Sequence, residues 1–366
     1  MSYLNSYLDY SEDLTFDELP FNEIDGVIFS LLPMLDCSIS FPKRGKRSIF
    51  HCVARHVRVN GLNPLGLLIK SDMAKLLFRV SKSQRFGDLK VHDFSSIIDP
   101  TTETQATALT VDISPSLSVI VFSGTDDTIV GWKEDFNMMY TDIVPCLEHS
   151  LKYLTYTSQK LKKFYIVGHS KGGMEAFYAY CFARKDIQRK TIKVYSYDGP
   201  GFSNYVNSLI EEPCKRKLRL LVPHGGIVGR MFSPVVEPII IYSSYHGLQQ
   251  HDPLSWEINR GKLHFHRMHE FNVQSNLIKQ KVDEILDNLP RNKQKEFVHY
   301  LFEVISAGGA LTLTDMRKKP HLALKQYLKL PPNVRKLITS LILHLANDKI
   351  ISRELLLGVI GINKKR

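Results

Sequence analysis

Short apolar segments recur through the middle of the chain and predict the strands of a buried sheet. Dense β-branched and aromatic residues predict strands over residues 107–113, 117–122, 164–167, 192–197, 218–222 and 238–243. The segments at 164–167, 192–197 and 218–222 are apolar at nearly every position. Both faces of these strands are therefore expected to be covered, as in a parallel sheet.

Helical patterns separate these strands. One ends near Lys163, and another begins at Gly172 and runs through Ala183. Alternating strands and helices predict an α/β fold with a mostly parallel central sheet flanked by helices.

The two ends of the chain have a different pattern. Residues 1–60 are acidic and aromatic, then apolar, which predicts a helical cap segment packed on the core. After Phe271, apolar residues at helical spacing predict amphipathic helices. We therefore divide the chain into this cap over 1–60, a central α/β domain over 61–274, and a basic helical C-terminal region over 275–366.

Composition is that of a globular protein, with 43% hydrophobic and 23% charged residues. No apolar run approaches the roughly 20 residues that span a bilayer. Residues 1–42 hold eight acidic residues and no Lys or Arg, so no signal peptide is expected. The five cysteines are scattered without a CxxC pair, which favours reduced thiols and a cytoplasmic location.

The formal net charge of +11 is concentrated near the C-terminus, where residues 276–366 contain 17 Lys or Arg and 8 Asp or Glu. These charges follow helical patterns without an aromatic stacking motif. We interpret them as a solvated helix face and predict no specific nucleic-acid partner. The alternative is a surface that contacts a partner or an anionic membrane.

The segment Gly168-His169-Ser170-Lys171-Gly172-Gly173 joins a predicted strand to a predicted helix. A GxSxG turn in this context strains the serine backbone and projects its hydroxyl above the sheet, as in α/β-hydrolase folds. We predict that Ser170 is a nucleophile and that the backbone N–H of Lys171 donates to the oxyanion. The alternative is a glycine-rich turn with an incidental serine.

A nucleophilic serine needs a histidine base, which in this fold follows the acid along the chain. Of the 14 histidines, His251 lies in a loop just beyond the last predicted strand and is our choice. His246 is the main competitor and His224 a weaker one. His169, inside the turn, is expected to be a packing residue.

The acid is predicted to be Asp198, at the carboxyl end of a predicted strand. The chain has no aspartate between Asp198 and Asp252, and the strand over 218–222 is followed by Pro223-His224-Gly225-Gly226. The alternative is that Asp198 only organises the turn that follows it.

No metal and no cofactor are predicted. The cluster His264, His266 and His269 has no carboxylate set nearby at a recognisable ligand spacing.

The segment Phe122-Ser123-Gly124-Thr125, followed by Trp132 and Asp135, resembles the class 3, fungal-type lipases. The chain is most similar to an uncharacterised bacterial branch of this family, on the basis of three motifs: Gly-His-Ser-Lys-Gly-Gly, Asp-Gly-Pro-Gly-Phe and Gln-His-Asp. This resemblance covers roughly Phe21 to Phe271. It implies that Thr125 supplies the second oxyanion donor. Ser123 departs from the family, which usually has Arg there.

Together these observations predict a serine hydrolase of the lipase or esterase type, which cleaves a small-molecule or lipid ester through an acyl-enzyme. A thioesterase or phospholipase would use the same residues. A non-catalytic lipase-like scaffold is the alternative outside enzymes. The apolar residues Ile129, Met138, Met139 and Tyr140 are expected either to contact an acyl chain or to be core residues.

Overall fold

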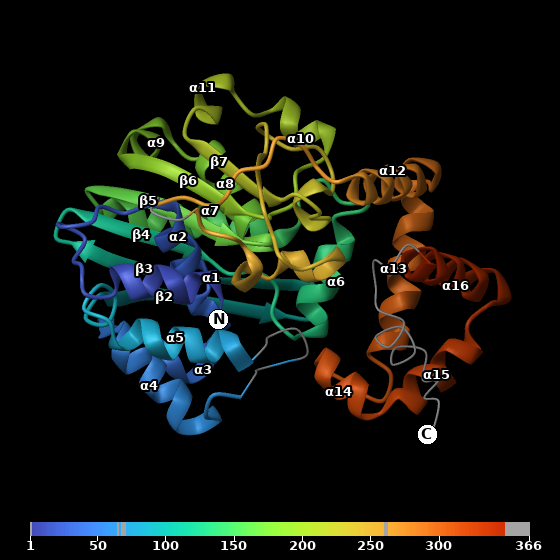
Figure 1. Ribbon diagram of the computed structural model, residues 1–366. Coiled ribbons are helices and arrows are strands. Elements are labelled where there is room, and N and C mark those ends of the chain that lie inside the picture. Colours follow the sequence, from blue (N-terminus) through green and yellow to red (C-terminus); the bar gives the residue numbers. More distant parts are fainter. Residues whose placement is uncertain (1, 64–65, 67–70, 260–262, 348–366) are drawn as a thin grey trace.

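An eight-stranded sheet with helices on both faces forms the centre of the molecule (Figure 1). The computed structural model describes residues 2–63, 66, 71–259 and 263–347. The strands are β1 (Arg47–Ser48), β2 (Lys90–Asp99), β3 (Thr104–Ser114), β4 (Leu117–Phe122), β5 (Lys163–His169), β6 (Thr191–Tyr197), β7 (Leu218–Pro223) and β8 (Ile239–Ile241).

The strands lie in the sheet in chain order. The pairings from β1 to β4 are antiparallel, and those from β4 to β8 are parallel. The predicted α/β-hydrolase fold, with a mostly parallel sheet and a helical C-terminal region, is confirmed.

The sequence pattern predicted β3 to β8 and missed the two strands at one edge. β2 has the sequence KVHDFSSIID and is only partly buried over most of its length. Its register with β3 shifts between His92 and Ser95, which interrupts the alternation of polar and apolar positions. β1 has two residues, too few for any periodic signal.

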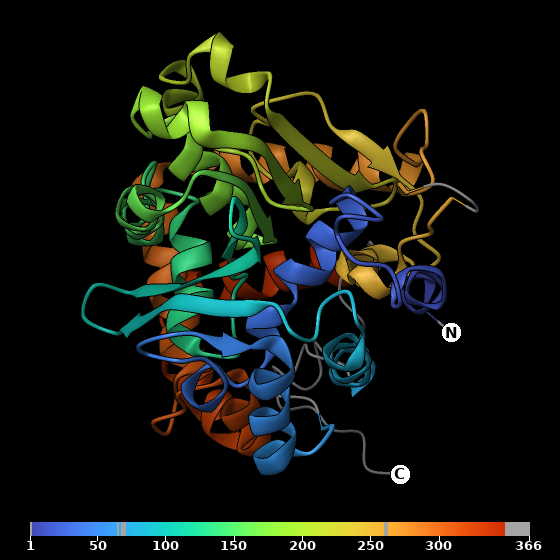
Figure 2. The same ribbon diagram turned by 90° about the vertical axis from the view of Figure 1, so that its left-hand side faces the viewer.

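Two hydrophobic cores lie on opposite faces of the sheet because successive side chains of a strand point to opposite sides. In β4, Val119 and Val121 belong to one core, whereas Ile120 and Phe122 belong to the other. The first core is covered by α1 (Tyr3–Ser11), α2 (Glu23–Ser30), α3 (Cys37–Ser40), α4 (Ile49–Asn60) and α5 (Ser71–Lys82) (Figure 2). The second is covered by α7 (Pro145–Thr157), α8 (Lys171–Cys181), α9 (Lys185–Lys190), α10 (Asn204–Ser208) and α11 (Glu212–Lys215).

A buried ion pair attaches the N-terminal segment to the chain after α5. Arg85 Nη2 lies 2.7 Å from Asp25 Oδ2, and both side chains are completely buried. Tyr7 donates its hydroxyl to the same carboxylate at 2.7 Å. Removing one partner would leave a buried charge uncompensated, so this contact ties α1 and α2 to the core.

The C-terminal region consists of α12 (Val273–Asn288), α13 (Arg291–Ile305), α14 (Leu313–Lys318), α15 (Pro320–Lys329) and α16 (Pro332–Asn347) (Figure 1). The helices α13 to α16 form a third hydrophobic cluster with α6 (Ile129–Asn137). Ile129, Met139 and Tyr140 pack in this cluster, and Met138 packs in the second core. Ile129 and Met138 are buried core residues, whereas Met139 and Tyr140 are partly buried against the cluster. Residues 348–366 of the predicted C-terminal region lie outside the described residues.

Among the helices described, none combines the length and apolar character that crossing a bilayer requires. All five cysteines are free thiols.

Candidate active site

Ser170 lies on a strained turn between β5 and α8. Its backbone has φ 57° and ψ −132°, a conformation that is costly for a residue with a Cβ atom. The glycines around it are required by close packing. A Cβ atom on Gly168 would lie 2.0 Å from Gly172 O, and one on Gly172 would lie 2.3 Å from Phe122 O. This is the strand-turn-helix geometry that presents a nucleophile above a sheet.

Asp198 follows β6, the strand next to β5, and therefore lies beside the turn. The backbone N–H of Ser170 donates to Tyr197 O at 3.0 Å, which joins the two strand ends directly. Asp198 is completely buried and has a positive φ of 50°. Its Oδ1 accepts the Gly229 N–H at 3.0 Å, and its Oδ2 lies 2.6 Å from His251 Nδ1.

His251 ends the short 3-10 helix Gly247–His251, and its ring is oriented by Asp198. A carboxylate on Nδ1 leaves Nε2 as the nitrogen that can accept a proton. The His251 side chain is 26% exposed, so the ring is partly accessible to solvent. This combination of orientation and access is what a general base needs.

Two buried residues, which the sequence analysis did not assign, hold the loop of His251. Gln250 Oε1 accepts the Gly225 N–H at 3.0 Å, and the Gln250 carbonyl accepts the Trp256 indole N–H at 2.7 Å. Both side chains are almost completely buried. Gln250 belongs to the Gln-His-Asp motif, but nothing in that motif indicates that its side chain reaches a different loop.

The remaining candidate histidines have other surroundings. His169 is buried, its Nε2 lies 2.9 Å from His251 O, and its ring is 4.4 Å from the His251 ring. Burial, assisted by the neighbouring His251, lowers the pKa of His169 well below its ordinary value, so it packs as a neutral ring. The His224 ring stacks on Tyr242 at 5.1 Å, and His246 is exposed. In the part of the chain that the structure describes, neither bonds Asp198.

The structure brings His251 and Asp198 together and places both next to the Ser170 turn. Within the described residues, no hydrogen bond of 3.5 Å or less joins the Ser170 hydroxyl to His251. Such bonds are often long in a free enzyme and tighten when substrate binds.

The loop after β4 packs directly on the turn. A Cβ atom on Gly124 would lie 2.9 Å from His169 O and 3.3 Å from Ser170 Cβ. The adjacent Ser123 is buried, and its hydroxyl donates to Gly124 O at 2.8 Å. On the other side, Lys171 is the first residue of α8, where a helix supplies no internal acceptor for the backbone N–H.

The Lys171 side chain turns away from the site and enters a buried network. Its ammonium donates to Gln105 O at 2.9 Å and to Gln105 Oε1 at 2.7 Å, and lies 3.1 Å from Glu134 Oε2. Glu134 also accepts the Gln105 and Cys146 N–H groups, at 2.9 and 2.8 Å. Burial alone would lower the Lys171 pKa, but the nearby carboxylates raise it above its ordinary value, so the lysine is charged.

Asp135 links this network to Thr125. Its Oδ2 accepts the Thr125 hydroxyl at 2.6 Å, and its Oδ1 lies 3.7 Å from Lys171 Nζ. Burial raises the pKa of Asp135 to about 6 although Lys171 opposes this shift.

Two of the three histidines considered as metal ligands, His264 and His266, make other contacts. His264 Nδ1 lies 2.9 Å from Phe265 O, and His266 Nδ1 lies 3.5 Å from Glu257 Oε1. Across the described ranges, no group of three or more His, Cys, Asp or Glu residues is placed to hold a metal ion.

A family model described as Mbeg1-like matches residues 80–303, which is more than half of the chain. The chain belongs to the Mbeg1-like family. This family is lipase-like, and the matched residues include the Ser170 turn, Asp198 and His251. The match continues through α12 and most of α13, beyond the boundary at residue 274.

Among solved structures, the chain is similar to one described as "Crystal structure of M37 lipase". The TM-score is 0.37 and the sequence identity 16%, over 57% of this chain and 70% of that one. This similarity is too low to say anything about activity. Among curated proteins, none matches the sequence.

Proposed function

We propose that this lipase-like hydrolase is a serine hydrolase that cleaves carboxylic esters. The observation that carries the proposal is the strained Ser170 turn beside a hydrogen-bonded Asp198–His251 pair. Strain at a serine, an acid on Nδ1 of a histidine and a helix N-terminus behind the serine are the parts of an acyl-transfer site.

In the proposed reaction, Ser170 Oγ attacks the ester carbonyl while His251 Nε2 takes its proton. The resulting imidazolium is stabilised by Asp198 and returns the proton to the leaving alcohol, which leaves an acyl-enzyme. Water, deprotonated by the same histidine, then releases the acid. The backbone N–H groups of Lys171 and Thr125 stabilise the oxyanion, assisted by the N-terminal end of α8.

The position of the loop after β4 supports the role of Thr125. Gly124 brings this loop into contact with Ser170, and Asp135 holds the Thr125 side chain. A thioester or a phospholipid ester presents the same carbonyl, so those substrates belong to the same proposal. A non-catalytic scaffold would not need the strained serine.

The test is covalent labelling of the folded protein with a fluorophosphonate probe. The wild-type chain and Ser208→Ala, a surface serine variant, are expected to be labelled, and Ser170→Ala is expected to remain unlabelled. Absence of labelling in folded wild-type protein would overturn the proposal. If labelling succeeds, hydrolysis of p-nitrophenyl esters and thioesters of increasing acyl length identifies the substrate class.

A further inference from the structure

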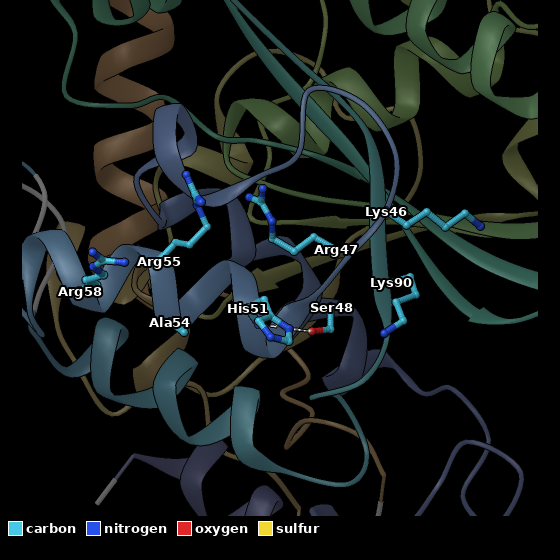
Figure 3. Close-up of a pocket in the computed structure, with 8 residues that line it drawn as sticks. All are labelled: Lys46, Arg47, Ser48, His51, Ala54, Arg55, Arg58 and Lys90. Atoms are coloured by element: carbon cyan, nitrogen blue, oxygen red, sulfur yellow. Dashed lines mark hydrogen bonds between the residues drawn. The ribbon is translucent and has the colours of Figure 1, made fainter.

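A hollow lined by positive charge runs along α4, at the edge of the sheet (Figure 3). Its volume is about 690 Å³. The lining residues come from α4, from β1 and the residue before it, and from the start of β2: Lys46, Arg47, Ser48, His51, Ala54, Arg55, Arg58 and Lys90. We call this hollow the α4 groove.

Five of the eight lining residues are Lys or Arg, and none is acidic. The surrounding sequence, residues 43–58, contains six Lys or Arg and no Asp or Glu. One of these five, Lys46, forms an ion pair in which its Nζ lies 2.5 Å from Asp112 Oδ2. Within the described part of the chain, the other four basic side chains of the groove form no ion pair with a carboxylate. The groove therefore holds charge that the protein itself does not neutralise.

Two of the arginines are held in place by backbone acceptors. Arg47 Nη1 donates to Ser40 O, and Arg55 Nε donates to Ile39 O at 2.6 Å. Each guanidinium keeps further N–H groups for a ligand. His51, Arg55 and Arg58 follow one another at helical spacing on α4, and Ala54 lies among them as a small side chain (Figure 3).

The α4 groove is distinct from the candidate active site. β1 is the edge strand, and Ser170 follows β5, four places further along the sheet. At a strand spacing of about 4.8 Å, the two are separated by roughly 19 Å across the sheet. Seven of the eight lining residues also come before residues 80–303, the segment that matches the family model, and Lys90 is the exception. It is therefore a feature of this chain outside the family-defining segment.

We propose that the α4 groove binds a phosphate-bearing ligand that carries two or more negative charges. Guanidinium groups match the geometry of phosphate oxygens and can bind them through paired hydrogen bonds. Four basic side chains without a carboxylate partner, around one hollow, exceed what a single monoanion neutralises. The ligand is either a soluble phosphate compound or the headgroup of an anionic lipid, because both present the same group.

The neighbouring surface is compatible with a lipid headgroup as one source. Phe50 and Val59 lie on α4 and are 44% and 66% exposed. Apolar side chains beside a basic patch enter the interfacial region of a bilayer when lipid phosphates occupy the patch.

Two probes test the proposal and separate these sources. Inorganic pyrophosphate is titrated into the full chain by calorimetry, and the chain is sedimented with phosphatidylcholine vesicles with and without phosphatidic acid. Binding of pyrophosphate alone identifies a soluble ligand. Vesicle binding that requires phosphatidic acid identifies a lipid headgroup. Either binding is expected to weaken as salt is raised.

Matched variants locate the binding. Arg58→Gln with Lys90→Gln removes two exposed charges of the groove and is expected to weaken binding at least about tenfold. Lys325→Gln with Lys329→Gln removes two exposed charges of α15 and is expected to leave binding unchanged. The proposal would be overturned if the protein bound neither pyrophosphate nor the phosphatidic acid vesicles. It would also be overturned if the two double variants lost binding affinity equally. Ester hydrolysis is measured separately and is expected to be unaltered in both double variants. The binding result therefore does not depend on whether the proposed hydrolysis occurs.

Discussion

Lys171 Nζ lies 3.1 Å from Glu134 Oε2, and both side chains are buried. Lys171 immediately follows the candidate nucleophile, whereas Glu134 lies on α6, the helix after the candidate oxyanion loop. The same ammonium bonds Gln105 in β3. One buried cation thus connects the turn of Ser170 to the elements that hold Thr125.

Replacing Lys171 with methionine is expected to destabilise the protein by about 3–5 kcal/mol, because removing one partner of a buried pair leaves the other charge uncompensated. Methionine keeps much of the side-chain volume, so the decrease in unfolding free energy measures the effect of removing the positive charge. Urea unfolding measures it. Lys162→Met, at an exposed lysine just before β5, is the control and is expected to change stability by less than about 0.5 kcal/mol. Equal effects of the two substitutions would show that the buried pair does not stabilise the fold.

The Asp198–His251 contact predicts which substitutions abolish ester hydrolysis. His251→Ala and Asp198→Asn are each expected to reduce kcat by about 10³–10⁴-fold, since one removes the base and the other its orientation. His246→Ala is the matched control and is expected to retain wild-type activity. Steady-state hydrolysis of a p-nitrophenyl ester provides the readout. Loss of turnover in His246→Ala instead of His251→Ala would contradict the assignment of the base.

A small effect of Asp198→Asn alone would have a different meaning. Asp198 also accepts the Gly229 N–H at 3.0 Å, so the residue can organise the adjacent loops without acting on His251. Thermal unfolding of the same variant distinguishes the two roles, because a purely organising residue changes stability more than activity.

The raised pKa of Asp135 predicts a pH dependence of stability. Burial raises this pKa from 3.8 to about 6, so the folded protein holds the proton more tightly than the unfolded chain. The stability that this proton contributes is present below about pH 4 and is lost as pH rises through about 6. In Asp135→Asn, the fall in unfolding free energy over this interval is expected to be smaller than in the wild type by about 3 kcal/mol. Urea unfolding at a series of pH values measures both curves, and parallel curves would refute the expectation.

Local patterns of hydrophobic residues were sufficient to predict most strands of the sheet. The strands β3 to β8 consist of apolar or β-branched segments that need no knowledge of their neighbours to be recognised. β1 and β2 form the antiparallel edge, where partial burial and a register shift removed the periodic signal.

The environment of Lys171 shows where such patterns fail. Its position after Ser170 predicts the use of its backbone N–H, but nothing in the local sequence indicates a side chain buried against Glu134 and Gln105. These residues are 37 and 66 positions away in the chain. Pairing over that separation depends on how α6 and β3 pack against the turn.

The sequence by itself determined the strand-turn-helix around Ser170, because the conformation of a turn depends on the few glycines and apolar residues that form it. It also made Asp198 the candidate acid, because the chain has no further aspartate before Asp252. Only the tertiary structure decided that His251, rather than His246 or His224, reaches that acid. The sequence of a loop has no hydrophobic periodicity from which the orientation of its side chains could be predicted. The position of His251 depends instead on the buried contacts of Gln250 with Gly225 and Trp256.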